Sequence, residues 1–162
     1  IHLSTGDIFR YNIKESTDLG VMAKEFMDKG ELVPDQVTIK MLESEVNKHP
    51  ESSGFIFDGF PRTTLQAKAL DDFLSSKNLS ITKMIALEVP NDELISRLFL
   101  RGKQSGRADD QDKSIIANRI KVYENQTAVL GEYYKAQKKL AIVNGVGSVD
   151  QITERLYRSI DL

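Results

Sequence analysis

The sequence predicts an α/β fold in which short parallel strands alternate with helices. Apolar runs bounded by turn residues alternate along the chain with segments of helical periodicity. Strands that are separated by helices in this way pair in parallel through right-handed crossovers. The length of 162 residues suits one domain, and 40% hydrophobic with 28% charged residues suits a packed core.

The composition argues against several classes of protein. The net charge is −2, whereas a general nucleic-acid binder is usually basic. No apolar run approaches the ~18 residues of a membrane span, so neither nucleic acid nor membrane is an expected partner. The absence of cysteine excludes disulfides and zinc-thiolate sites, and we expect a cytoplasmic setting. The chain begins at Ile1 without Met or signal peptide, which we interpret as a piece of a longer protein or a processed product.

Three helices are expected in the first third of the chain, over residues 4–15, 17–30 and 33–50. The first opens on a capping box, with Ser4 followed three residues later by Asp7. Thr17 begins the second, and Gly30 ends it. The third begins around Pro34, and its helical apolar positions end before Pro50.

Strands and helices then alternate. Strands are expected at residues 54–58, 81–89 and 140–144, and helices at about 64–77, 91–101, 113–138 and 148–160. The first of these strands is short, aromatic and bounded by turns, which favours a buried strand. Thr63 or Thr64 caps the helix that follows, Asn91 and Asp92 cap the next, and residues 102–112 form a polar loop. Three strands are few for a sheet that is covered on both faces by helices, which indicates missing chain upstream.

The segment around Asp58 carries the first chemical motif. Asp58 lies at the carboxyl end of its strand, where open α/β sheets bind ligands, and resembles the aspartate that organises Mg²⁺ in phosphoryl transfer. Gly59 permits close approach of a ligand to the backbone, and Arg62 follows a rigid proline at the start of a helix. The alternative is that Asp58 only pairs with Arg62 or caps that helix.

Clustered arginines suggest an anion site, because the guanidinium fork matches phosphate oxygens. Arg97 and Arg101 are four residues apart on one helix face, an unfavourable pair without an anion between them. Glu93 offers Arg97 an ordinary ion pair, whereas Arg101 has no such local partner. The alternative for the cluster is surface ion pairing.

The loop after Arg101 contains two glycines and ends in Arg107, Asp109 and Asp110. It suits a mobile flap that brings Arg107 over a phosphate and excludes water. The alternative is a solvated loop whose aspartates favour the N-terminus of the next helix. At the other end of the chain, the hydroxyl of Ser4 and the free N–H groups beside it suit an anionic ligand that Arg10 also reaches.

Taken in order, these segments closely resemble the adenylate kinase family. The resemblance spans essentially all 162 residues. It is carried by residues 2–10 (HLSTGDIFR), 27–34 (MDKGELVP), 54–63 (GFIFDGFPRT), 97–110, 119–123 (RIKVY) and 143–150 (VNGVGSVD).

The resemblance implies a single domain over residues 1–162, with a three-layer P-loop kinase core and a parallel sheet. About 4–33 and 34–50 would be the helices of an arm that binds the nucleoside monophosphate, and about 102–112 a short lid. It implies the reaction ATP + AMP ⇌ 2 ADP with Mg²⁺, by a monomer.

The resemblance also implies roles for individual residues. The AMP-binding set would be Thr5, Arg10, Glu31, Leu32, Val33, Gly59, Arg62, Gln66, Arg107 and Arg119. The transferring phosphates would be bound by Arg62, Arg97, Arg101, Arg107 and Arg119. Asp58 would order the water ligands of Mg²⁺, while Arg101 and Gly147 would contact ATP.

Two features bear on substrate and metal. Thr5 is the residue that adenylate kinases carry where the similar UMP/CMP kinases usually have Ala, and Gln66 suits adenine. A UMP/CMP kinase and a non-catalytic nucleotide-binding module remain the alternatives. Long-lid relatives often hold zinc with cysteines, and this chain has none, so we expect no zinc.

One departure from the family is large. The P-loop pattern Gly-x-x-Gly-x-Gly-Lys is absent, together with the strand before it and the helix after it. We expect about 25–30 further residues, the span of one βα unit, to precede Ile1. Residues 1–162 alone should leave the neighbours of the central strand unpaired and an apolar cleft open. They should bind AMP weakly. Their turnover should be negligible, because the phosphates of ATP lose their main binding site.

Overall fold

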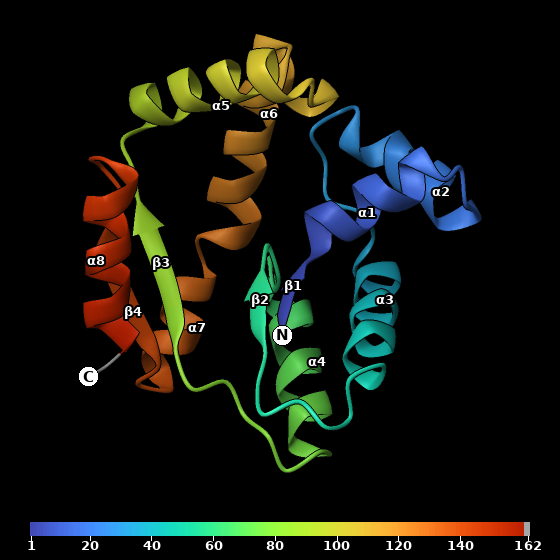
Figure 1. The fold of residues 1–162 in the computed structure, drawn as a ribbon, viewed down its shortest axis with the longest axis vertical. Coiled ribbons are helices and arrows are strands. Elements are labelled where there is room, and N and C mark those ends of the chain that lie inside the picture. Colours follow the sequence, from blue (N-terminus) through green and yellow to red (C-terminus); the bar gives the residue numbers. More distant parts are fainter. Residues whose placement is uncertain (161–162) are drawn as a thin grey trace.

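Within residues 1–160, four short strands pair in parallel as two separate two-stranded sheets (Figure 1). The structure is a computed structural model and describes residues 1–160. Strand β1 (His2–Ser4) pairs with β2 (Ile56–Asp58), with His2 opposite Ile56. Strand β3 (Met84–Glu88) pairs with β4 (Leu140–Asn144), with Met84 opposite Leu140. The parallel pairing is confirmed.

The prediction of only three strands is wrong, because β1 was missed. It is three residues long and Leu3 is its one apolar residue, so no alternating pattern marks it. The prediction that residues 54–58 form a buried strand is also wrong. β2 is shorter, and Ile56 is 67% exposed.

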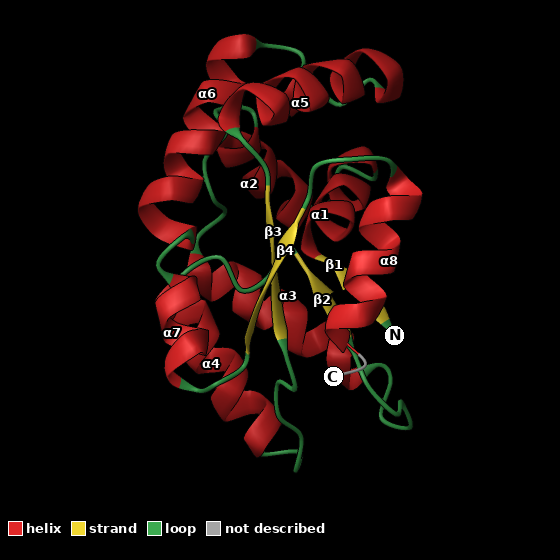
Figure 2. Ribbon diagram, turned by 90° about the vertical axis from the view of Figure 1, so that its left-hand side faces the viewer, coloured by secondary structure: helices red, strands yellow, loops and turns green. Residues whose placement is uncertain are grey.

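The helices, in chain order, are α1 (Thr5–Lys14), α2 (Asp18–Met27), α3 (Asp35–Asn47), α4 (Thr64–Ser75), α5 (Asn91–Ser105), α6 (Lys113–Val122), α7 (Leu130–Ala136) and α8 (Val149–Ile160). A short 3₁₀ turn, η1 (Ala108–Asp110), and a π-helix, η2 (Tyr123–Thr127), lie on either side of α6. Figure 2 shows α5 and α6 together at one end of the strands and α8 beside β3 and β4.

Three predicted helix starts are confirmed by their caps. The backbone N–H of Asp7 donates to Ser4 Oγ at 3.3 Å, so Ser4 caps α1. Thr17 caps α2, and Thr63 caps α4. The predicted cap of α5 is wrong: the helix begins after Pro90 without a side-chain cap, and the amide of Asn91 donates instead to Glu124 Oε1 at 3.1 Å.

The polar loop expected over residues 102–112 begins later than predicted. Helix α5 continues through Ser105 and ends at Gly106, which adopts a left-handed conformation with φ +70°. Gly102 lies buried inside this extension, where a Cβ atom would stand 2.3 Å from the carbonyl oxygen of Asp110. Glycine is required at this position because the backbone of Asp110 packs so closely against it, and not because the loop must be flexible.

The single helix expected over residues 113–138 is divided into α6, η2 and α7. The predicted apolar stripe is Ile116, Ile120, Tyr123, Thr127, Leu130 and Tyr134. Its two ends are fully buried, but Tyr123, the first residue of the π-helix, is half exposed, and the π-helix changes the direction of the side chains that follow.

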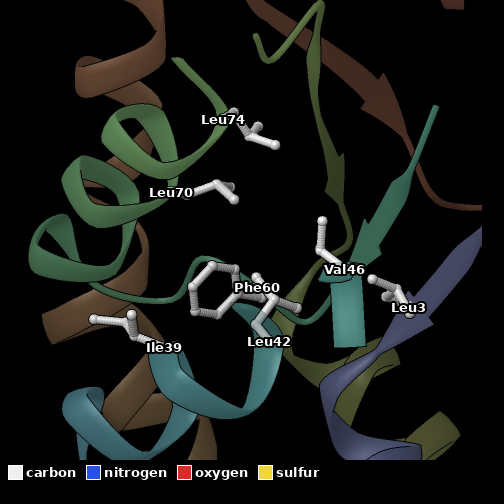
Figure 3. Close-up of a cluster of buried hydrophobic side chains, with 7 residues drawn as sticks. All are labelled: Leu3, Ile39, Leu42, Val46, Phe60, Leu70 and Leu74. Atoms are coloured by element: carbon white, nitrogen blue, oxygen red, sulfur yellow. The ribbon is translucent and has the colours of Figure 1, made fainter. Parts of the chain in front are cut away.

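The largest apolar cluster lies between β1, α3, α4 and the turn after β2 (Figure 3). It consists of Leu3, Ile39, Leu42, Val46, Phe60, Leu70 and Leu74. A second cluster joins α1, α2 and α3, and a third joins α4 to α7 through Ala67, Leu130 and Tyr134. The buried Phe60 side chain anchors the turn that carries Gly59 and Arg62. Among the helices of residues 1–160, none combines the length and the apolar character needed to cross a bilayer.

Candidate active site

The carboxyl ends of β1 and β2 meet at one edge and bring the first site residues together. Thr5, buried at the start of α1, donates its hydroxyl hydrogen to the carbonyl oxygen of Gly59 at 3.0 Å. Gly59 has φ +71°, and a Cβ atom there would lie 2.8 Å from Arg62 Nη2 and 3.1 Å from Thr5 Oγ1. Only glycine therefore fits this turn without displacing Thr5 or Arg62.

Arg62 is held against the same turn. Its Nε donates to the carbonyl oxygen of Gly59 at 2.8 Å, and its backbone N–H donates to Gln66 Oε1 at 2.8 Å. Burial, with the charge of Arg119 added to it, lowers the pKa of the Arg62 guanidinium. Within residues 1–160 Arg62 forms no ion pair. A bound anion would compensate this charge.

Arg10 and Arg107 converge on one carboxylate. Arg10 Nη2 donates to Asp7 Oδ1 at 2.5 Å, and Arg107 Nη2 lies 3.6 Å from the same oxygen. The hydrogen bond from Arg10 holds the pKa of Asp7 below its usual range. Burial lowers the pKa of Arg107, and the charges of Arg10 and Arg101 lower it further. The loop places Arg107 beside the start of α1, while its movement as a flap over a phosphate stays a prediction.

Arg101 and Arg119 share the buried carboxylate of Asp110, which was expected to lie in a polar loop before the next helix. Asp110 is fully buried, accepts from Arg101 Nε at 2.6 Å, and accepts from Arg119 Nη1 through its other oxygen. Arg119 Nη1 also lies 2.8 Å from Asp109 Oδ2. The alternative of a solvated loop is wrong for Asp110, which is buried, and the side-chain cap of α6 comes from Asp112. The sequence feature that could have indicated this contact is the pair of aspartates, Asp109 and Asp110, at the end of the loop that contains Arg107.

The turn after α2 lies against α6, beside Arg119. The side-chain amide of Asn118 donates to the carbonyl oxygen of Lys29 at 2.8 Å. Gly30 has φ +71°, and a Cβ atom there would lie 2.8 Å from both Arg119 Cγ and the carbonyl oxygen of Ile115. The adjoining Glu31, Leu32 and Val33 are therefore brought toward the arginine cluster. We use that name for Arg10, Arg62, Arg101, Arg107 and Arg119. Within this set the charges of Arg119 and Arg10 act on Arg62, and those of Arg10 and Arg101 act on Arg107.

Arg97 takes part in a different set of contacts. Its Nε donates to Glu93 Oε1 at 2.8 Å, the local ion pair weighed as its alternative, and its Nη1 donates to the carbonyl oxygen of Gly145 at 2.8 Å. The turn that follows contains Gly147 at φ +131°, where a Cβ atom would lie 2.6 Å from Gln151 Oε1. Arg97 thus connects α5 to the turn after β4.

Asp58 and Gln66 differ in accessibility. The Asp58 carboxylate is 61% exposed and lies 3.5 Å from His2 Nε2. It neither pairs with Arg62 nor caps α4, so both of its alternatives are wrong. The buried Gln66 donates to Asp35 Oδ1 at 2.8 Å while accepting from Arg62. Asp35 was not singled out from the sequence.

Comparison with known proteins identifies relatives over nearly the whole chain. The sequence model of a family described as adenylate kinase matches residues 1–139. A protein of Flavobacterium psychrophilum named adenylate kinase is 59% identical over 160 residues, which is 99% of this chain and 84% of that protein. Proteins of the same name from Flavobacterium johnsoniae and Bacteroides fragilis are 56% and 44% identical over the same shares.

Proposed function

This chain belongs to the adenylate kinase family, and we propose that its arginine cluster is where the phosphoryl group passes between nucleotides. Its activity is the reversible transfer of a phosphoryl group from ATP to AMP, giving two ADP. The single observation that supports this location is that Arg62, held against a turn that needs glycine, lies within the electrostatic reach of Arg10 and Arg119, while Arg10 and Arg101 act in the same way on Arg107. Arg62 there has no carboxylate partner within residues 1–160.

AMP binds between α1, the turn after α2 and the turn after β2 in this proposal. Arg10 and Arg62 take its phosphate, and Thr5 and Gly59 form the wall beside it. The residues after Gly30, Glu31–Val33, line the pocket, and Gln66 reads the adenine edge. The Gln66 amide has one N–H and one lone pair left after its contacts with Asp35 and Arg62.

The transferring phosphoryl group lies between the two nucleotides. An oxygen of the AMP phosphate attacks the γ-phosphorus of ATP, the bond to the β,γ-bridging oxygen breaks, and ADP leaves. Such a transfer needs positioning and charge stabilisation rather than a side-chain nucleophile. Arg62, Arg97, Arg101, Arg107 and Arg119 supply the positive charge, and Gly147 offers backbone contacts to the ATP adenine. Segment 102–112 closes as a lid and keeps water out.

A magnesium ion bound with ATP fits the residues at the strand ends. Mg²⁺ is usually bound by one or two carboxylates together with waters and substrate phosphates. The exposed Asp58 carboxylate at the end of β2 offers such a group. Asp58 would hold water ligands of the ion, which neutralises phosphate charge when bound. Zinc is not part of the proposal, because the sequence has no cysteine.

We assign all of residues 1–162 to one kinase domain that acts as a monomer in the cytoplasm. Segments 4–33 and 34–50 form the AMP arm, and the remainder outside the lid forms the core.

A further strand between the two sheets completes a three-layer core in this proposal. Support comes from the exposed apolar side chains of Ile56, Leu87 and Ile142 on three of the four strands. An open pocket of about 550 Å³, lined in part by Gly131 and Leu140, lies beside β4. A strand followed by a P-loop would cover this surface and cradle the phosphates of ATP with backbone N–H groups.

The test is a coupled assay of nucleoside diphosphate formation by the chain supplied with a P-loop segment, with AMP, UMP or CMP as acceptor. AMP should give the highest kcat/KM, and equal or faster turnover with UMP or CMP would contradict the assignment. Arg62→Ala or Arg101→Ala should lower kcat by about 10²- to 10³-fold, as loss of a preorganised charge partner does. Arg158→Ala is the matched control, because Arg158 lies exposed on α8 and pairs with Glu154.

A further inference from the structure

The π-helix η2 lies between α6 and α7, whose functional and buried side chains point in different directions. The N–H of Ala128 donates to the carbonyl oxygen of Tyr123 at 2.9 Å, five residues back. One extra residue in a helical turn rotates the side chains that follow by about 100°. The π-helix therefore separates the face of α6 that carries Arg119 from the face of α7 that carries Leu130 and Tyr134. Such wide turns occur frequently at functional sites.

The last residue of this π-helix contacts the turn that carries Arg62. Thr127 Oγ1 donates to the carbonyl oxygen of Arg62 at 2.9 Å, across 65 residues of sequence. The Arg62 backbone is thereby held at both of its polar groups, since its N–H already donates to Gln66. The guanidinium is held separately through Gly59. Thr127 is the only one of these partners that comes from outside residues 59–66.

Packing keeps Thr127 at this place. About one and two turns further along, Leu130 and Tyr134 are fully buried against Ala67 on α4, the helix that begins just after Arg62. The third cluster therefore fixes the distance between η2 and the Arg62 turn. Valine carries a methyl group where threonine carries its hydroxyl, so Thr127→Val changes the packing little and loses the hydrogen bond.

We propose that Thr127 is a positioning residue for phosphoryl transfer, which orients Arg62 by holding its backbone carbonyl group. The proposal rests on the assignment of Arg62 to the AMP phosphate. A guanidinium held at its base by fixed backbone contacts meets a phosphate with little reorganisation. Loss of the Thr127 hydroxyl leaves Arg62 charged and present but less well aligned.

The test measures steady-state kinetics of the chain supplied with a P-loop segment, with AMP varied at saturating ATP, and then with ATP varied. Thr127→Val should lower kcat/KM for AMP about tenfold, the effect of one hydrogen bond, and leave KM for ATP within twofold. Thr127→Ser should restore kcat/KM, because it keeps the hydroxyl. In an Arg62→Ala background, Thr127→Val should cause no further loss.

Tyr133→Phe is the matched control. It removes another hydrogen bond between this helical segment and α4, from the Tyr133 hydroxyl to Asp71 Oδ2 at 2.7 Å, without touching Arg62. An equal loss of kcat/KM in Tyr133→Phe would overturn the proposal, as would an unchanged Thr127→Val enzyme. An Arg62→Ala enzyme with normal kcat/KM would instead overturn the assignment of Arg62 and, with it, the role of Thr127.

Discussion

Replacing Asp110 with Asn should weaken the arginine cluster and the fold together. The Asp110 carboxylate is fully buried and uses one oxygen for Arg101 and the other for Arg119. Asparagine keeps the shape but offers one acceptor oxygen, and its NH₂ group then faces a guanidinium donor. One charge-assisted hydrogen bond is lost and two donors are left opposed.

The magnitude follows from the burial of the three partners. A hydrogen bond to a charged group contributes about 1.5–3 kcal/mol, and an unsatisfied buried group costs about 1–3 kcal/mol. The Arg101 and Arg119 side chains are 41% and 24% exposed, so water replaces part of what they lose. We expect the free energy of unfolding to fall by about 3 kcal/mol and kcat to fall about 100-fold, because both guanidinia lose their orientation.

Urea unfolding measures the first quantity, and the coupled assay measures the second. Asp109→Asn is the control, because Asp109 contacts Arg119 but not Arg101, and it should cost only about 1 kcal/mol. The reasoning would be refuted if Asp110→Asn unfolded within ~0.5 kcal/mol of the parent protein and kept its kcat.

Three further outcomes are expected. Gly30→Ala should raise KM for AMP several-fold, because the positive φ of Gly30 and the neighbouring helix leave no room for a Cβ atom. The control Gly131→Ala on α7 should leave KM for AMP unchanged, and equal KM values for the two variants would contradict this reasoning. Burial and Asp71 raise the pKa of Tyr133 to about 12, so the stability it contributes is complete below about pH 10 and is lost toward pH 12. Tyr133→Phe should remove that alkaline loss in urea titrations, and an unchanged pH profile would exclude this origin. The chain 1–162 alone should show negligible turnover, and addition of a P-loop segment should restore it; full turnover by the chain alone would contradict the need for a P-loop.

Helix starts were predicted well because their causes are local. Ser4, Thr17 and Thr63 cap helices through hydrogen bonds to an N–H three residues ahead, and each cap is visible as a short sequence pattern. Helix ends and interruptions were predicted less well. Whether α5 continues through Ser105 depends on the contact between Gly102 and a carbonyl group that is distant along the chain.

The candidate site divides in the same way. The neighbours Asp58, Gly59 and Arg62 lie in one turn, so the sequence was enough to place them together. The ion pair between Arg101 and Asp110 could not be predicted, because the Asp110 carboxylate reaches Arg101 only when the intervening segment folds back. Arg97 was expected to bind phosphate and donates instead to Glu93 and a carbonyl oxygen in this structure; its phosphate role stays a prediction.

Residue types and spacings were sufficient to identify the family, the helix caps and the glycine-dependent turn, because each of these depends on neighbours along the chain. Partners brought together by packing required the folded chain. The Thr127 hydroxyl meets Arg62 only because a π-helix and the burial of Tyr134 set the position of η2. A sequence pattern predicts the contacts that a residue makes within one or two turns of its own position. The contacts that align a phosphate site come instead from elements that lie tens of residues apart in the sequence.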